Sequence, residues 1–178
     1  MTAARPSVDL RNLRIEPLAD PEALKDFDSG EREVDRHIPK CCEWHRRYRH
    51  RVFCAFLGTQ SIAVGFYCLG ISASESKYLS EEIIKTSEGH AFVPFIYLNY
   101  LAVRLDYQQN GIGTILLLNA LERCAHTVKN IGIYGVALHA LTDLAAGLYD
   151  RYGFREYGGR TKYPFMVLPA QTLIDLFP

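Results

Sequence analysis

Long apolar runs are missing from this sequence. The longest, residues 62–69, is interrupted by Gly65 and falls far short of the roughly 18 residues that a membrane helix needs. The first dozen residues lack the apolar segment of a secretory signal and predict a loosely ordered lead-in. We therefore expect a cytoplasmic protein that does not associate with membranes.

Cysteine is scarce, and the five residues cannot all pair in a disulfide framework. We expect them to be reduced thiols. His37, Cys41 and His45 would share one face of a helix, which raises the alternative of a metal site. Their spacing matches no established zinc pattern, so the sequence predicts no metal.

Net charge is also absent, because 20 Lys and Arg residues balance 20 Asp and Glu residues. No global attraction to nucleic acid is implied. The charges are unevenly distributed, however, and residues 40–51 form a basic segment with Glu43 as its only acid. Its cations are Lys40, Arg46, Arg47, Arg49 and Arg51.

Two interpretations of this basic segment stay open. It is either a solvated helix face, the commoner case, or a phosphate-binding surface, for which the planar fork of arginine is well suited. Trp44, Tyr48 and Phe53 interleave with the cations and could stack on bases. We favour the interpretation that they anchor the segment to the core. Cations near the C-terminus would extend a phosphate-binding surface: Arg151, Arg155, Arg160 and Lys162.

The chain of 178 residues, 48% hydrophobic and 22% charged, predicts one globular domain over residues 1–178. Strands are expected at 13–18, 51–57, 62–70, 94–103, 132–138, 154–157 and 163–168. Helices are expected at 21–27, 31–46 with an interruption at Pro39, 112–129, 142–152 and 170–176, and residues 74–89 are expected to be partly helical. This order predicts an α/β (α+β) fold with a mixed sheet and helices on both faces.

A glycine-containing turn at residues 108–114 joins an apolar strand to a long helix. The unpaired N–H groups and partial positive charge of a helix start can bind a pyrophosphate, and Gly111 and Gly113 would let it approach. The alternative is an ordinary strand-to-helix turn. The dinucleotide-binding pattern is not met, because residue 116 is Leu, and the Gly-Lys-Ser/Thr of nucleotide-triphosphate loops is absent.

Two motifs resemble those of the GNAT acetyltransferases. Gln108, Gly111 and Gly113 match motif A of that family, Arg/Gln-x-x-Gly-x-Gly/Ala, and residues 148–154 resemble its motif B helix. The resemblance implies the GNAT fold, with a mostly antiparallel sheet, and acetyl-CoA as co-substrate. It implies cofactor contacts from a strand and a loop: Leu101, Ala102, Val103, Gln108, Gln109, Asn110, Gly111, Ile112, Gly113 and Thr114. It further implies that the strand ending at Val103 splays from the one ending near His139.

A narrower resemblance concerns residues 27–31, which look like the opening of the GNAT toxins of toxin–antitoxin pairs. It implies acetylation of the α-amino group of aminoacyl-tRNA, with the five cations of the basic segment contacting the tRNA. It also implies a homodimer and a ribbon-helix-helix antitoxin as partner. Two alternatives remain: an enzyme that acetylates a small amine or a protein N-terminus, and a non-catalytic CoA-binding or interaction module.

The motif B resemblance makes Tyr149 the candidate catalytic residue, as hydrogen-bond and proton donor to the departing thiolate. The N–H of Val103 would polarise the thioester carbonyl. Glu16, His139 and Asp143 are possible general bases, but each has an easy structural role. The α-amine of an aminoacyl ester has a low pKa, so a strong base is not required.

Overall fold

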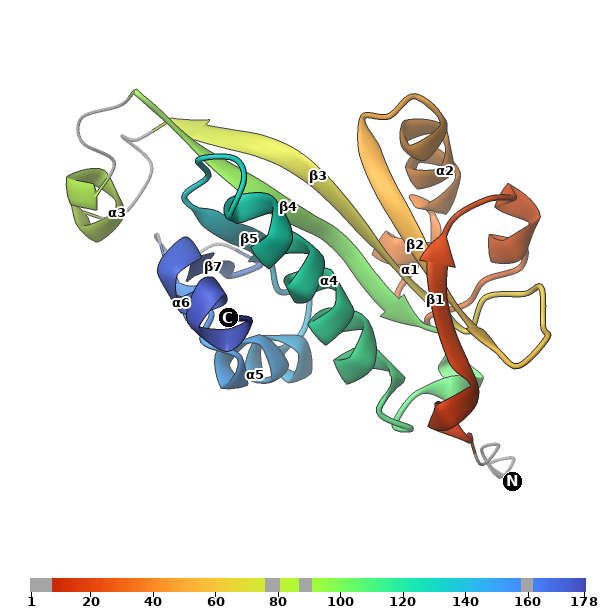
Figure 1. Ribbon diagram of the computed structural model, residues 1–178. Helices are drawn as coiled ribbons and strands as arrows, with labels where there is room; N and C mark the ends of the chain where they lie inside the picture. Colours follow the sequence, from red (N-terminus) through yellow and green to blue (C-terminus); the bar gives the residue numbers. More distant parts are fainter. Residues whose placement is uncertain (1–7, 76–80, 87–90, 158–161) are drawn as a thin grey trace. The chain divides into compact units, whose positions relative to one another are not determined.

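The computed structural model describes residues 8–75, 81–86, 91–157 and 162–178 (Figure 1). The strands are β1 (Leu13–Pro17), β2 (His50–Leu57), β3 (Gly65–Glu75), β4 (Phe92–Val103), β5 (Gly135–His139), β6 (Arg155–Glu156) and β7 (Phe165–Pro169). The α-helices are α1 (Arg32–Asp35), α2 (Ile38–Arg46), α3 (Glu81–Thr86), α4 (Ile112–Val128), α5 (Asp143–Arg151) and α6 (Ala170–Leu176). Short 3-10 helices occupy Leu10–Asn12, Pro21–Leu24 and Leu105–Tyr107.

The strands form one seven-stranded sheet in the order β1-β2-β3-β4-β5-β7-β6. β1 pairs antiparallel with β2, and β7 pairs antiparallel with both β5 and β6. β4 and β5 are parallel. The predicted class, a mixed and mostly antiparallel sheet with helices, is therefore confirmed.

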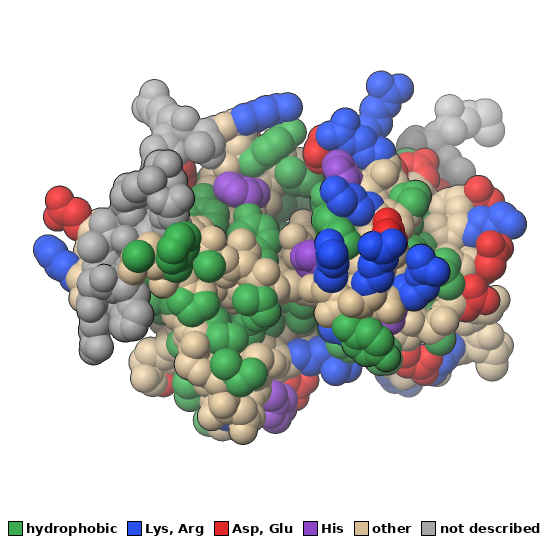
Figure 2. Space-filling view, turned by 90° about the horizontal axis from the view of Figure 1, so that it is seen from above, with side chains coloured by type: hydrophobic (Ala, Val, Ile, Leu, Met, Phe, Trp, Pro, Cys, Tyr) green, Lys and Arg blue, Asp and Glu red, His purple; other side chains and the backbone are tan. Residues whose placement is uncertain are grey.

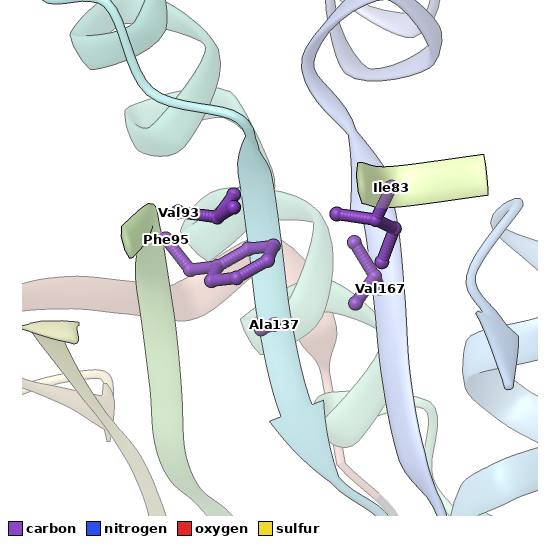
Figure 3. Packing of buried hydrophobic residues seen from close by; sticks show 5 residues of the cluster. All are labelled: Ile83, Val93, Phe95, Ala137 and Val167. Carbon is purple, nitrogen blue, oxygen red and sulfur yellow. The ribbon is translucent and has the colours of Figure 1, made fainter. Parts of the chain in front are cut away.

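The chain forms two compact units, each with its own buried residues. The first comprises residues 1–69 and 100–120, and its helix α2 packs on β2. The second comprises residues 70–99 and 121–178, and its helix α6 packs on β5 and β7. Figure 3 shows a buried cluster of the second unit, to which α3, β4, β5 and β7 contribute. Its members are Ile83, Val93, Phe95, Ala137 and Val167.

The helix predicted over residues 31–46 is divided into α1 and α2. The interruption falls at Arg36 and His37 rather than at Pro39, which lies in the first turn of α2. A proline is tolerated there because first-turn amides have no intrahelical acceptor. The start of α5 agrees with prediction, since the Thr142 hydroxyl accepts the Ala145 N–H at 3.1 Å and caps the helix.

Gly65, the first residue of β3, lies against the end of β4 and the side of α4. A Cβ atom at this position would lie 2.9 Å from the carbonyl oxygen of Ala102 and 2.8 Å from Cδ1 of Leu116. The leucine side chain can turn away, but the Ala102 carbonyl belongs to the backbone of β4. The lack of a side chain at Gly65 therefore sets the position of the end of β4.

We expect Gly65→Ala to lower the free energy of unfolding by about 1–3 kcal/mol, the usual cost of overpacking. Denaturant unfolding measures this change, with Gly132→Ala as the matched control. A Cβ at Gly132 would have no neighbour within 4 Å, so the control should be near neutral. Equal stability of the two variants would contradict this packing account.

Candidate active site

The pairing of β4 with β5 is short. Its register runs from Phe95 opposite Gly135 to Tyr97 opposite Ala137, although β4 continues to Val103 and β5 to His139. The last six residues of β4 are thus outside this ladder. The β4–β5 ladder therefore ends before the residues at which the resemblance places the pantetheine arm.

Two contacts near the end of β4 show to which side its backbone N–H and C=O groups point. One contact is with Gly65 of β3 and the other with Val64, the residue before β3. The Arg104 N–H donates to the Val64 carbonyl at 2.9 Å, and the Ala102 carbonyl faces Gly65. Because backbone groups alternate sides along a strand, Leu101 and Val103 direct theirs away from β3. The Val103 carbonyl accepts a bond from the Gln108 side chain at 3.0 Å, which agrees with this direction.

The loop between β4 and α4 is held by its own side-chain amides. Gln108 Nε2 donates to the Ser29 carbonyl at 2.8 Å as well as to that of Val103. Asn110 Nδ2 lies 3.3 Å from the carbonyl oxygens of both Tyr107 and Gln108. The donors of these two amides are thus directed to the protein's own backbone, so the structure gives both residues a role in shaping the loop.

Helix α4 begins directly after Gly111, which has φ +83°. The Ile115 N–H donates to the Gly111 carbonyl at 3.2 Å, so the N–H groups of Ile112, Gly113 and Thr114 precede the first intrahelical bond. Their partial positive charge can bind a phosphate. Only a glycine adopts the Gly111 conformation without strain.

Backbone conformation explains the glycine at position 111, but the glycine at position 113 has a different explanation. A Cβ there would lie 3.7 Å from Cγ2 of Val103, an ordinary contact, so packing within the chain does not require glycine. A ligand that approaches the helix start is a sufficient reason for it. Gly111 is thus required by its backbone conformation, whereas the blocking of a ligand by a side chain at Gly113 stays a prediction.

The segment with the toxin-like opening motif, residues 27–31, supports this loop. The Ser29 hydroxyl donates to Asp35 Oδ1 at 2.7 Å and the Ser29 N–H donates to the same oxygen at 3.1 Å. The Leu105 N–H donates to the Asp28 carbonyl at 2.8 Å. Sequence reasoning missed Asp35 because its partner lies six residues earlier, outside the usual helix-capping pattern.

Tyr149 lies on α5 and is 7% exposed. Its ring packs against Phe154, with centroids 5.6 Å apart, and no hydrogen bond to its hydroxyl is seen within the described residues. Burial raises the pKa of Tyr149 to about 12. The hydroxyl therefore stays protonated near neutral pH and can donate a hydrogen bond to a developing anion.

The three possible general bases have different surroundings. Glu16 pairs with Arg14, and Asp143 lies in the first turn of α5, where its charge favours the helix. His139 is exposed at the end of β5, with Nδ1 3.2 Å from the Tyr163 carbonyl. A carbonyl only accepts, so Nδ1 carries the proton and Nε2 is the basic nitrogen of the neutral ring.

Comparison with protein families shows a match to the Acetyltransferase (GNAT) domain over residues 48–156, which include the loop and Tyr149. This chain belongs to the GNAT acetyltransferase family. It is 28% identical over 138 residues to a tRNA-acetylating toxin of Mycobacterium tuberculosis, covering 77% of this chain and 81% of that protein.

Solved structures of toxins share the fold of this acetyltransferase. AtaT complexed with acetyl-methionyl-tRNAfMet matches with a TM-score of 0.78 at 24% identity, covering 93% of this chain and 99% of that one. A tyrosine-to-phenylalanine variant of AtaT, bound to the C-terminus of the antitoxin AtaR and acetyl-CoA, matches with a TM-score of 0.72 at 23% identity. It covers 93% of this chain and 97% of that chain.

The basic segment of the acetyltransferase covers α2 and the start of β2. Figure 2 shows Lys and Arg side chains gathered on this face. Arg47 pairs with Glu43 at 2.8 Å, whereas Arg46 and Arg49 are exposed and make no ion pair within the described residues. Lys40 lies 4.9 Å from the ring centroid of Trp44. Arg46 and Arg49 therefore leave positive charge on this surface that no acidic side chain of the described residues neutralises.

The cations near the C-terminus, which the sequence predicts to extend the phosphate-binding surface, differ in their surroundings. Arg155 pairs with Asp150 at 2.8 Å, while Arg151 is exposed. Lys162 lies 4.8 Å from the ring centroid of Tyr163. Arg160 lies outside the described residues.

The two aromatic residues of the basic segment, and Phe53 just after it, have different environments. Phe53 is buried and stacks on Tyr67, and half-buried Trp44 stacks on His50 with centroids 4.3 Å apart. Both agree with the predicted anchoring role. Tyr48 is 82% exposed, so that prediction is wrong for Tyr48, because the chain turns at the end of α2 and directs this ring into solvent.

The two histidines of the helix face considered for a metal site form hydrogen bonds with the protein backbone. His37 Nδ1 lies 2.6 Å from the Glu33 carbonyl, and His45 Nδ1 accepts the Val52 N–H at 2.9 Å. No cluster of three or more His, Cys, Asp or Glu suited to a metal occurs among the described residues. Nor does any helix of that part of the chain have the length and apolar character to cross a membrane.

Proposed function

We propose that this acetyltransferase moves the acetyl group of acetyl-CoA onto the α-amino group of aminoacyl-tRNA and so blocks translation. Similarity to a tRNA-acetylating toxin over 77% of the chain supports the choice of acceptor. The structural observation that carries the proposal is the exposed charge of Arg46 and Arg49, which make no ion pair with any residue that the structure describes. A polyanionic acceptor is recognised by cations that the protein leaves unneutralised.

Acetyl-CoA would bind through backbone groups. The pyrophosphate would accept hydrogen bonds from the N–H groups of Ile112, Gly113 and Thr114, where the helix dipole favours negative charge. The pantetheine arm would pair with Leu101 and Val103, whose backbone groups face away from β3. In this arrangement the Val103 N–H polarises the thioester carbonyl.

Tyr149 would stabilise the departing sulfur. The amine attacks the thioester carbon, the C–S bond breaks, and negative charge develops on sulfur. The pKa of Tyr149, about 12, is above the value of about 8.5 for a free thiol. Its hydroxyl therefore acts first by hydrogen bonding. The sulfur then takes the proton of the Tyr149 hydroxyl. The proton that the amine releases restores the tyrosine hydroxyl, so that the products are the amide and free CoA thiol.

The acceptor amine needs little help to lose its proton. A free α-amine has a pKa of about 7.7–8.0, and the adjacent ester lowers it further. A large neutral fraction is therefore present at neutral pH. This chemistry suits an enzyme in which Glu16 and Asp143 have structural roles.

We extend the proposal to partners and location. AtaT binds the C-terminus of its antitoxin AtaR, and similarity in fold supports an antitoxin partner for this chain. The ribbon-helix-helix type of that partner is what the family resemblance implies. Acetylation of charged tRNA requires a cytoplasmic enzyme. A homodimer is part of the same proposal, and sedimentation of the purified protein tests it.

Transfer of label from acetyl-CoA to a bulk pool of charged tRNA tests the function, with deacylated tRNA as the control substrate. We expect label only on the charged pool, and its loss after mild alkaline hydrolysis of the aminoacyl ester. Labelling of a small amine or of a protein N-terminus, with none on charged tRNA, would overturn the proposed acceptor.

Salt dependence tests the role of the basic segment. We expect Arg46→Gln and Arg49→Gln each to raise the KM for charged tRNA and to reduce the slope of log KM against log salt by about one. Arg11→Gln is the control, because Arg11 is exposed and already paired with Asp9. Equal salt slopes for all three variants would show that the basic segment is only a solvated surface.

A further inference from the structure

Helix α2 ends in a Schellman motif, and Tyr48 occupies its left-handed position. The Tyr48 N–H donates to the His45 carbonyl at 3.1 Å, and the Arg49 N–H donates to the Trp44 carbonyl at 3.0 Å. These are the two hydrogen bonds that define the motif. Tyr48 has φ +57°, a conformation for which glycine is the usual residue.

Neither backbone conformation nor burial explains a tyrosine at this position. A Cβ atom is unfavourable at positive φ, and the ring is 82% exposed. Glycine would form the same turn with less strain. The chain thus carries a large aromatic ring in solvent at a position where the fold favours having no side chain.

The surroundings of the ring indicate its ligand. Cζ of Arg51 lies 5.1 Å from the ring centroid of Tyr48, so a cation covers one face and the other is available for stacking. Arg47 and Arg49 flank Tyr48 in sequence and are exposed. An exposed aromatic ring among arginines suits a nucleobase with its phosphates, since stacking is tolerant of sequence and the cations contact the backbone.

We propose that the Tyr48 ring is a stacking site for an unpaired base of the tRNA whose aminoacyl group receives the acetyl group. Arg51 orients the ring, and the neighbouring arginines contact the adjoining phosphates. The inference rests on the proposed function and adds a specific contact to it. It also accounts for the strained turn, because the ring is retained for binding at a cost in stability.

The test compares Tyr48→Gly with Tyr48→Phe. For Tyr48→Gly we expect the Kd for deacylated tRNA, and the KM for charged tRNA, to rise roughly five- to a hundredfold, the usual effect of losing one stacked base. The melting temperature should stay the same or increase, because glycine fits the turn. Tyr48→Phe keeps the ring and should keep the affinity, and the salt slope should be unchanged in both variants.

Several outcomes would overturn the stacking site. They are an unchanged Kd in Tyr48→Gly, an equal loss in Tyr48→Phe, and an unchanged Kd accompanied by altered self-association or antitoxin binding. In the last case the ring contacts a second copy or a protein partner instead. Failure of the proposed function is distinguishable, since the wild-type protein would then transfer no acetyl group to charged tRNA while the binding comparison could still be made.

Discussion

Replacing Tyr149 with phenylalanine is expected to lower kcat for acetyl transfer by about a hundredfold to ten-thousandfold, the usual range for loss of a proton-donating group. The hydroxyl is the only group removed, and within the described residues it makes no hydrogen bond. The ring, which packs against Phe154, is kept. Stability and acetyl-CoA affinity should therefore change little while turnover is lost.

Tyr152→Phe is the matched control for this experiment, because Tyr152 lies one turn later and is only half-buried. Single-turnover transfer from acetyl-CoA, measured with both variants, separates chemistry from product release. Full activity of Tyr149→Phe would show that another group protonates the sulfur. Binding of CoA without turnover by the wild-type protein would instead favour a non-catalytic module.

Gly111→Ala should weaken acetyl-CoA binding roughly ten- to a hundredfold. An alanine at φ +83° is strained, and the loop must shift to relieve that strain. Such a shift moves the N–H groups at the start of α4 away from the pyrophosphate. Each charge-assisted hydrogen bond lost is worth about 1.5–3 kcal/mol, which corresponds to the stated range.

Gly58→Ala provides a close control for this loss of affinity. Gly58 also has a left-handed backbone, with φ +54°, and a Cβ there would meet nothing within 4 Å. At Gly111 the nearest atom would be Cδ1 of Leu10 at 3.6 Å, an ordinary contact. Both variants should lose similar stability by thermal unfolding, and only Gly111→Ala should lose affinity by calorimetry. Similar affinities would contradict the phosphate-binding role of the loop.

Much of this fold follows from local sequence signals. The predicted helix over residues 170–176 matches α6, and Thr142 and Gly153 were placed correctly at the two ends of α5. These features depend on capping residues and on glycine, whose conformational effects are local. The predicted strand ending at residue 70 continues to Glu75, because sheet pairing extends it where polar and small residues gave no apolar signal.

The candidate site was only partly predictable, because some of its contacts join residues that are distant in sequence. The strand–turn–helix and its two glycines are local, so the loop between β4 and α4 could be predicted. The family pattern could not show that the Gln108 amide donates to Ser29, because those residues are distant in sequence. Exposure of Tyr48 also escaped prediction, since it depends on the direction of the chain after α2.

Mass spectrometry of tRNA digested to nucleosides after reaction with acetyl-CoA tests whether this enzyme acetylates the α-amino group of aminoacyl-tRNA. We expect N-acetyl-aminoacyl adenosine from charged tRNA, none from deacylated tRNA, and none with Tyr149→Phe. Acetylated small amines or proteins, with unmodified aminoacyl adenosine, would show that aminoacyl-tRNA is not the acceptor.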